Sequence, residues 1–354
     1  GNSGPTASTA DYAVDTLAPT LSSVSISDNG NGNANNADTV SLTFTVSEAL
    51  SANPTCTIND GTGEAMGAAV SVSNALLVYT CSVVVADDDG NGAMTYSIAF
   101  TDAAGNAGDA VSSGSGSVTI DNLHPTLASV TLSVNGDGDG SASDTVTLTF
   151  TASETLLADP TCSWTDGSGS MATASTTASN GGSGLAYTCT NTVANADDDG
   201  SVGYSIAFTD AAGNAGDAVT SGTGSVDIDN THPTLSSVSI STNGNGNANN
   251  ADTVSLTFTA SEALLADPTC TINDGVGPAM GAAVSVSNAL LVYTCSVVVA
   301  DDDGNGAMTY SIAFTDAAGN AGDAVSSGSG SVTIDNAHPT LSTPAMSHNA
   351  GSGI

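Results

Sequence analysis

Residues 97–111 read SIAFTDAAGNAGDAV, and the same fifteen residues recur unchanged at 205–219 and 311–325. The first four residues alternate polar and apolar side chains, which is typical of a strand with one buried face. The remaining residues are rich in Gly, Ala and Asp, a composition typical of turns. The stretch therefore predicts a β-strand followed by an acidic turn, built three times in one chain.

The rest of the sequence follows the same period. Pro-Thr-Leu recurs about every 106 residues, at Pro19, Pro125, Pro233 and Pro339. The chain of 354 residues is therefore expected to contain three domains, at 19–122, 123–230 and 231–336. Residues 12–19 match the end of a repeat, so 1–18 is expected to be the end of a preceding repeat, a linker or a donor strand. Residues 339–354 begin another first strand, so 337–354 is expected to be the start of a following repeat or a tail. We expect a window cut from a longer array; alternatively, the end segments complete a neighbouring copy by strand addition.

Seven segments of the first repeat alternate apolar and small polar residues, with turn residues between them. We expect strands at residues 20–27, 39–47, 55–59, 68–73, 76–85, 93–101 and 117–121. The inward side chains are expected to be Val40, Leu42, Phe44 and Val46 on the second strand and Met94, Tyr96, Ile98 and Phe100 on the sixth. No segment shows a sustained helical period. The predicted fold class is all-β, a tandem array of seven-stranded immunoglobulin-like β-sandwiches.

Cysteines occur two per repeat, as Cys56/Cys81, Cys162/Cys189 and Cys270/Cys295. One pair per repeat predicts one disulfide per domain, joining the third and fifth strands, and an oxidising environment. A zinc site is the weaker interpretation, because two thiolates need two further ligands. The expected location is extracellular or on the cell surface.

The charge is entirely acidic, with 36 Asp and Glu, no Lys or Arg, and a formal net charge of −36. Such a chain lacks the cations that hold phosphate, so nucleic acid is not expected as a partner. Lysine-dependent chemistry is excluded as well. The sequence shows no signal peptide and no membrane-spanning run, and no enzymatic activity is expected, because the acids repeat in every domain rather than forming one centre.

Three segments carry a resemblance to a known family: DTVSLTFTVSEAL, SIAFTDAAGNAG and GSVTIDNLHPTLASV. They resemble the tandem immunoglobulin-like repeats, of the bacterial Ig-like and cadherin-like kind, that large bacterial and algal surface proteins contain. The resemblance covers essentially the whole chain, and the TDAAGNAG turn with the following Asp-Asn-x-x-Pro is its most specific part. It implies an extracellular array that serves as a stalk, adhesin or fibre, often stabilised by calcium, and it specifies no ligand.

Loops at the two ends of each sandwich hold most of the acids. Because successive strands alternate in direction, the front end of one domain should meet the rear end of the next, bringing five or more carboxylates together without a basic residue. Calcium is the cation expected there, since it takes six to eight oxygen ligands. The candidate ligands are Asp87, Asp88, Asp89, Asp121, Asn122, Glu154 and Asp210 at one junction and Asp197, Asp198, Asp199, Asp229, Asn230, Glu262 and Asp316 at the other.

A second candidate metal loop follows the first strand of the middle repeat. Its oxygen-bearing residues alternate with Gly, as in calcium loops: Asn135, Asp137 and Asp139, with Asp144 close behind. Gly-Asn runs also supply turns with positive φ, so a purely structural role stays open. The TDAAGNAG turn has the same alternative: Asp102 would accept backbone N–H bonds while Gly105 and Asn106 adopt left-handed conformations.

Taken together, these features favour a structural component of an extracellular fibre, filament or stalk, built as a calcium-stabilised, disulfide-linked rod. The rival hypothesis is an adhesin segment that binds a glycan or a cell-surface receptor through exposed loops. Uniform loops with few aromatic residues favour the first. The expected partners are neighbouring copies of the chain or further repeats of a longer one, and the abundant Ser and Thr allow O-linked glycans.

Overall fold

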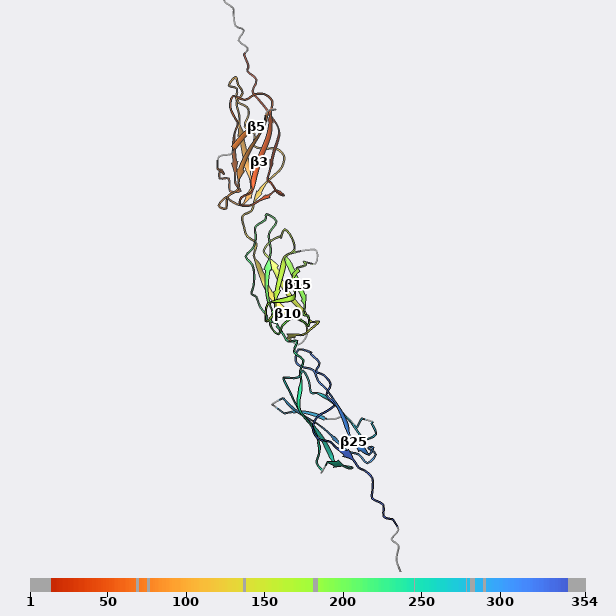
Figure 1. Cartoon of the computed structure of the whole chain (residues 1–354). Helices are drawn as coiled ribbons and strands as arrows, with labels where there is room; N and C mark the ends of the chain where they lie inside the picture. The colour runs from red at the N-terminus through yellow and green to blue at the C-terminus, as the bar shows by residue number, and fades with distance from the viewer. Residues whose placement is uncertain are drawn as a thin grey trace, which may run out of the picture.

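The chain folds into three β-sandwiches that follow one another end to end (Figure 1). The computed structural model describes residues 14–67, 70–74, 77–135, 138–180, 184–244, 246–277, 279–280, 284–288 and 291–342. Within these ranges there is no helix. We call the three sandwiches domains 1, 2 and 3. The end at which the chain enters a domain is its rear pole, and the end at which it leaves is its front pole.

Each domain contributes nine strands to the described structure. In domain 1 they are β1 (Leu21–Ser27), β2 (Asn33–Ala34), β3 (Thr39–Val46), β4 (Thr55–Asn59), β5 (Val70–Asn74), β6 (Val78–Val84), β7 (Gly92–Ala93), β8 (Thr95–Ala99) and β9 (Thr119–Ile120). In domain 2 they are β10 (Leu127–Val134), β11 (Asp139–Gly140), β12 (Thr145–Ala152), β13 (Thr161–Thr165), β14 (Ser170–Thr177), β15 (Ala186–Thr192), β16 (Gly200–Ser201), β17 (Gly203–Ala207) and β18 (Asp227–Ile228). In domain 3 they are β19 (Leu235–Thr242), β20 (Asn247–Ala248), β21 (Thr253–Ala260), β22 (Thr269–Asn273), β23 (Val284–Asn288), β24 (Val292–Val298), β25 (Gly306–Ala307), β26 (Thr309–Ala313) and β27 (Thr333–Ile334).

Two sheets face each other in domain 1. One has the order β1-β3-β6-β5, and the other contains β4 and β8. A small third sheet, β2-β9-β7, closes the front pole. The four-stranded order corresponds to the A-B-E-D sheet of immunoglobulin domains, and β4 and β8 correspond to strands C and F. The predicted fold class, a tandem array of immunoglobulin-like sandwiches, is confirmed.

The core of each domain follows from the period-two pattern. Val40, Leu42 and Phe44 of β3 are completely buried, while the alternating Ser and Thr face outward. On the facing sheet, Ile98 is also fully buried. Phe44 lies opposite Tyr79 of β6, and the two rings stack with their centroids 5.9 Å apart. The predicted inward set is confirmed on both strands, except that Met94 is only partly buried.

The number of strands was predicted too low. Seven strands were expected in the first repeat, and the structure adds two of two residues each, β2 and β7. Residue pairs this short carry no hydrophobic alternation, so the sequence gives no sign of them. Both pair with β9 and thereby connect the loops of the front pole to the end of the domain.

Three disulfides join the facing sheets, Cys56–Cys81, Cys162–Cys189 and Cys270–Cys295. In domain 1 the bond runs from β4 to β6, the third and fifth strands of the sequence prediction. This confirms the pairing and its departure from the bridge of antibody domains, which joins strands B and F.

Domain 2 differs from its neighbours in one strand. In domains 1 and 3, β5 and β23 extend the larger sheet, whereas β14 pairs with β13 on the opposite sheet. Trp164 of β13, with 1% of its surface exposed, donates from Nε1 to the hydroxyl of Thr176 in β14 at 2.8 Å. The equivalent residue in domain 1 is Ile58, which has no such donor. The buried indole therefore favours the placement of β14 beside β13.

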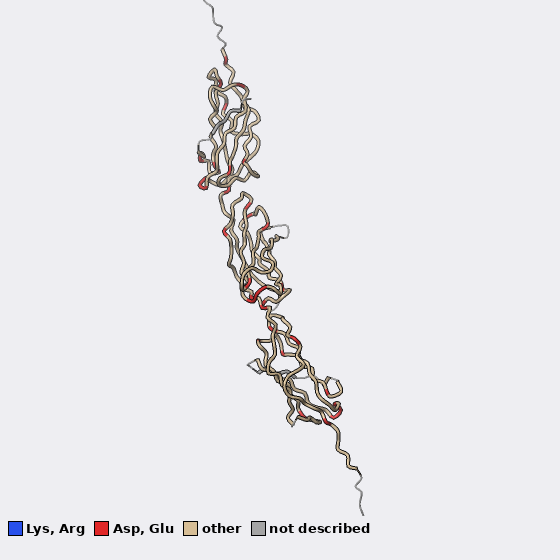
Figure 2. The backbone as a smooth tube through the Cα atoms, in the orientation of Figure 1, with Lys and Arg blue, Asp and Glu red and all other residues tan. Residues whose placement is uncertain are grey.

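Asp and Glu gather in the loops at the domain ends (Figure 2). The strand faces between the poles carry Ser and Thr instead. Front-pole loops of one domain therefore meet rear-pole loops of the next, as strand parity predicted.

Candidate metal centres at the domain junctions

The repeated TDAAGN turn is organised by its own aspartate. In domain 2, Oδ1 of Asp210 accepts hydrogen bonds from the backbone N–H groups of Ala212, Gly213 and Asn214, at 2.8–2.9 Å. Gly213 has φ of 103°, a left-handed conformation that suits glycine. Asp210 is only 1% exposed. This arrangement confirms the structural role that was kept open for the aspartate and the glycine of this turn, since Asp102 and Gly105 act alike in domain 1.

The asparagine of the turn has a different role from the one expected. Asn106 is not among the described residues with positive φ. In domain 2, Nδ2 of Asn214 donates to the carbonyls of Asp121 at 2.8 Å and Leu123 at 3.1 Å, both in the linker from domain 1. It also donates to Oδ2 of Asp210 at 2.9 Å. The turn therefore binds the backbone of the incoming linker.

The same contacts occur at the other two rear poles. Nδ2 of Asn106 donates to the carbonyls of Asp15 and Leu17, at 3.1 and 3.3 Å. Nδ2 of Asn320 donates to the carbonyl of Asp229 at 2.7 Å. Sequence reasoning missed these contacts, because nothing in the letters TDAAGN shows that its amide reaches a segment about 90 residues earlier.

The linker also contacts the domain that follows it through a histidine side chain. Nδ1 of His124 lies 2.7 Å from the carbonyl oxygen of Ala215, and Nδ1 of His232 lies 2.8 Å from that of Ala321. At these distances Nδ1 carries the proton and donates to the carbonyl. The first linker has Ala18 at this position.

The front pole of domain 1 also contacts this turn. Nδ2 of Asn31 donates to the carbonyl of Ala211 at 2.9 Å, and Nδ2 of Asn35 donates to Oδ1 of Asn214 at 3.2 Å. The Gly-Asn loop after β1 thus lies against domain 2. Linker and loop together fix the direction in which domain 2 continues from domain 1.

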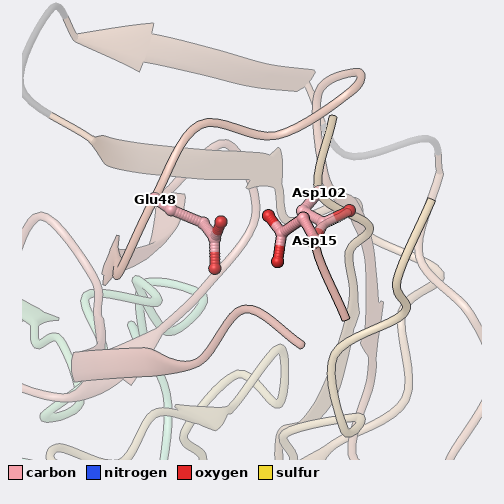
Figure 3. Close-up of side chains that lie close together, drawn as sticks. All are labelled: Asp15, Glu48 and Asp102. Carbon is pink, nitrogen blue, oxygen red and sulfur yellow. The ribbon is translucent and has the colours of Figure 1, made fainter. Parts of the chain in front are cut away.

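Carboxylates converge beside each of these linkers. Three groups have ligand atoms within 4.8 Å of one another: the first triad (Asp15, Glu48, Asp102), the second triad (Asp121, Glu154, Asp210) and the third triad (Asp229, Glu262, Asp316). In the first triad Glu48 lies opposite Asp15 and Asp102, which overlap in this view (Figure 3). Each triad combines a linker aspartate, a glutamate from the loop after the second long strand, and the turn aspartate.

Local backbone pairing positions the glutamate. Leu156 forms an isolated antiparallel bridge with Asp210, and the same pairing joins Leu50 to Asp102 and Leu264 to Asp316. Glu154 lies two residues before Leu156, so the bridge fixes its loop beside the turn aspartate.

In the second and third triads, ionising all three carboxylates at once is unfavourable. Burial, Asp121 and Asp210 raise the pKa of Glu154. The pKa of Glu262 is raised by burial and by Asp229, and that of Asp229 by burial and by Asp316. No Lys or Arg exists to compensate. The second and third triads therefore favour either a proton or a cation, whereas in the first triad hydrogen bonds, chiefly that from the side chain of Asn106, lower the pKa of Asp102.

Several predicted ligands lie outside the triads. The junction was expected to concentrate five or more carboxylates, whereas each described group contains three, and none includes the aspartate runs 87–89 or 197–199. Oδ2 of Asp89 accepts from the N–H of Ala86, and Oδ2 of Asp197 accepts from that of Ala194. These two aspartates close their own turns.

The two aspartate runs are also not equivalent in position. The linker residue Asn122 donates its backbone N–H to Oδ1 of Asn91, while Asn230 donates to Oδ1 of Asp199. Asp199 therefore corresponds to Asn91, and the run in domain 2 is shifted by two residues. The extra carboxylate of Asp199 lies close enough to Asp229 to contribute to the raised pKa of that residue.

The linker asparagines were predicted as ligands as well. Nδ2 of Asn122 donates to the carbonyls of Ala86 and Asp89, and Nδ2 of Asn230 donates to those of Ala194 and Asp197. Oδ1 of both residues is buried and has no hydrogen-bond partner in the described structure. Each therefore leaves one unpaired oxygen next in sequence to the linker aspartate.

The second candidate loop is organised by hydrogen bonds of its own. Oδ1 of Asn135 accepts from the N–H of Thr145, and Oδ2 of Asp144 accepts from the N–H of Ser141 at 2.8 Å. Asp139 is exposed in β11, and Asp137 lies outside the described residues. These contacts are those of a turn, and calcium binding by this loop stays a prediction.

The first triad was not among the predicted sites. Asp15 aligns with Asp121, and Glu48 aligns with Glu154, through the same repeat period that defined the domains. Carrying the candidate ligands back by one repeat would have found both residues.

No described helix has the length and apolar character needed to cross a membrane. Neither a protein-family model nor a curated protein matches the sequence. Solved structures similar to the chain include a tetra-tandem repeat in the extending region of a large adhesion protein, 21% identical over 90% of this chain and 75% of that chain, with a TM-score of 0.33. The chicken CNTN1 FN1–FN3 domains are 12% identical over 85% and 96%, with a TM-score of 0.29. Extracellular domains 3–5 of Drosophila OTK are 13% identical over 88% and 96%, with a TM-score of 0.23. None of these likenesses indicates a function for this chain.

Proposed function

We propose that the chain is a structural segment of an extracellular fibre, filament or stalk, in which calcium bound at each domain junction keeps the rod straight. One observation carries this proposal. Every rear pole combines a linker aspartate with a glutamate and an aspartate of its own domain, within 4.8 Å and without a basic residue.

The donor set of the triads suits calcium. All of the ligands are carboxylate oxygens, which hard cations prefer, and the triads contain neither His nor Cys. Magnesium usually binds one or two carboxylates in strict octahedral geometry, whereas calcium accepts more ligands in flexible arrangements. The unpaired oxygens of Asn122 and Asn230 lie in the same linkers. The residues present therefore fit calcium, with water completing the coordination.

Calcium would stiffen the rod by connecting groups that otherwise repel. Two carboxylates about 4 Å apart repel by about 4 kcal/mol at an effective dielectric constant near 20. A divalent cation would reverse the sign of this interaction and tie the linker aspartate to the following domain. The amide of Asn214 and the ring of His124 already hold the same linker, so the ion would act on a junction whose path is set.

An extracellular setting agrees with the covalent structure. Three disulfides need an oxidising compartment to form and persist. The exposed Thr and Ser on the outer faces of the long strands, such as Thr149 and Thr151 of β12, are candidate positions for O-linked glycans.

The test is a comparison of shape and stability with calcium and with chelator. In calcium, small-angle scattering should report a straight rod; chelation should shorten the maximum dimension and lower the melting temperature. Glu154→Gln should reproduce part of this loss even in calcium, while Glu64→Gln, an exposed glutamate outside the triads, should not. Scattering and melting that do not respond to chelator would overturn the calcium proposal.

A further inference from the structure

The chain enters and leaves each domain along neighbouring parallel segments. In domain 1, β1 pairs in parallel with the segment around Ser115. The N–H of Ile26 donates to the carbonyl of Ser115 at 3.0 Å, and the N–H of Ser115 donates to that of Val24 at 2.8 Å. On its other side β1 pairs with β3. The first strand is thus held on both edges.

A second parallel pair lies at the front pole. Strand β2 pairs in parallel with β9, the last strand of the domain. The N–H of Thr119 donates to the carbonyl of Gly32, and the N–H of Asp121 donates to that of Ala34, both at 2.9 Å. Together with the bonds near Ser115, four backbone hydrogen bonds connect the entering and the leaving parts of the chain.

This arrangement determines how the domain responds to tension. Both segments run from the rear pole to the front pole, while tension pulls the entering chain backward and the leaving chain forward. The two can separate only by sliding along each other. Hydrogen bonds between strands lie across the strand direction, so sliding loads all of them together rather than one after another.

We propose that each sandwich is a load-bearing element that resists tension along the rod through these parallel contacts. The proposal extends the structural role above and does not depend on calcium, because the contacts lie within one domain. It assigns a mechanical function to β2, β9 and the segment around Ser115, in addition to the core packing that Ala34 of β2 and Ile120 of β9 provide.

The disulfide would limit the extension of a domain that does give way. Cys56 of β4 and Cys81 of β6 are 25 residues apart, and neither is part of the parallel contacts. Once the outer strands separate, the chain between the two cysteines stays closed by a covalent bond. The loop in domain 3 has the same length, and that in domain 2 has 27 residues.

Among the described residues, domain 2 has the fewest backbone hydrogen bonds in its parallel contacts, although the hydroxyls of Thr131 and Thr223 add a side-chain contact at 3.0 Å. Leu132 donates to Thr223, Thr223 to Val130, and Asp229 to Gly140, which makes three backbone bonds among its described residues. Domain 3 has four, as domain 1 does. In addition, Asp139 of β11 lies directly opposite Asp227 of β18, and like charges opposite each other destabilise a strand pair. Domain 2 should therefore yield first.

Single-molecule force spectroscopy on the whole chain, pulled from its two ends, tests the proposal. Three unfolding events are expected, and the weakest should be that of domain 2. Under reducing conditions each event should lengthen by about 90 Å, because 25 or 27 residues are released at roughly 3.6 Å each. Replacing Cys56 and Cys81 by Ala should lengthen one event only and so identify domain 1.

Two substitutions separate this mechanism from general stability. Asp227→Thr gives domain 2 the residue that domains 1 and 3 carry at this position. This variant should raise the unfolding force of domain 2 toward that of the other two domains. Asp217→Asn, which lies outside the strand pair, should leave that force unchanged. Thr119→Pro removes one N–H donor and should lower the force of domain 1 only, whereas Thr119→Ala keeps the donor and should not; an unchanged disulfide-limited length shows that the variant is folded.

Two outcomes would overturn the proposal: an unchanged weakest force in Asp227→Thr, or domains that yield at the same force in Thr119→Pro and in the unaltered chain. Measuring in calcium and again in chelator separates this proposal from the previous one. Domain forces that persist in chelator support load-bearing whether or not calcium binds.

Discussion

Asn214 of domain 2 donates its side-chain amide to the backbone carbonyl of Asp121, 93 residues earlier, at 2.8 Å. The same amide also contacts the carboxylate of Asp210, which belongs to the second triad. One side chain thus connects the path of the linker with the candidate cation site. We therefore expect the straightness of the rod and the chemistry of the triads to be coupled.

Removing this amide should loosen the junction between domains 1 and 2. Asn214→Ala should lower the free energy of unfolding of domain 2 by about 1–2 kcal/mol, because it removes hydrogen bonds to two linker carbonyls and to a buried carboxylate. Small-angle scattering should show a broader distribution of shapes. Asn195→Ala, an exposed asparagine at the opposite pole, is the control, and equal effects of the two variants would contradict the role of Asn214.

The triads predict an unusual pH response in chelator. The pKa values of Glu154, Glu262 and Asp229 are raised, so the folded chain binds more protons than the unfolded chain between the ordinary and the raised values. Stability should therefore fall as pH rises through this window. The melting temperature should rise on mild acidification, and the double variant Glu154→Gln, Glu262→Gln should lose most of that rise, since burial and Asp316 still raise the pKa of Asp229. A flat profile in the unaltered chain would contradict the raised values.

Asp60 predicts the opposite behaviour at lower pH. The N–H of Gly90 is the main group that lowers its pKa, to about 2, with help from Thr62 and Glu64. A lowered pKa contributes stability above the ordinary value, and this contribution is lost as pH falls through the folded value. Asp60→Asn should lower the melting temperature of domain 1 at pH 5, and the difference should shrink toward pH 2. A difference in melting temperature that does not change with pH would show that the charge of Asp60 does not contribute to stability.

The lone tryptophan makes domain 2 separately observable. Thr176→Val removes the acceptor of the Trp164 indole N–H and should destabilise domain 2 by about 1–3 kcal/mol, since the donor is left unpaired in a buried site. Tryptophan fluorescence during denaturant unfolding measures this directly. Thr173→Val, at an exposed position of the same strand, should have little effect.

Reduction of the disulfides should lower the stability of every domain, while the three domains still unfold in separate transitions. In the chain-entropy model, closing a loop of 25 residues contributes about 3 kcal/mol. Replacing Cys56 and Cys81 by Ala should therefore shift only one of three calorimetric transitions downward. Free thiols in the native protein, or a shift of all the transitions, would contradict one independent bond per domain.

Much of the fold was predictable because it depends on local pattern. The alternation along residues 39–46 identifies β3 and its buried face, and the recurrence of one cysteine pair per repeat identifies the disulfide. Strands β2 and β7 were not predictable, because two residues carry no period. The placement of β14 was not predictable either, since it involves the hydrogen bond from the indole of Trp164 to Thr176 on the neighbouring strand of the same sheet.

The site was predictable in part for a similar reason. Strand parity correctly brought Asp121, Glu154 and Asp210 to one junction, although calcium binding there stays a prediction. The aspartate runs were predicted as ligands because of their charge. However, Oδ2 of Asp89 and Oδ2 of Asp197 each accept a hydrogen bond from a backbone N–H three residues earlier. Charge density alone does not show which oxygens are already occupied by backbone N–H groups.

Calcium titration by calorimetry measures directly whether the triads bind calcium. We expect three sites per chain, one for each triad, with dissociation constants of roughly 10⁻⁴ to 10⁻³ M as in other extracellular modules. Glu154→Gln and Glu262→Gln should each remove one site, and Glu64→Gln should remove none. No saturable binding in millimolar calcium, or binding that both triad variants retain in full, would contradict calcium binding at the triads.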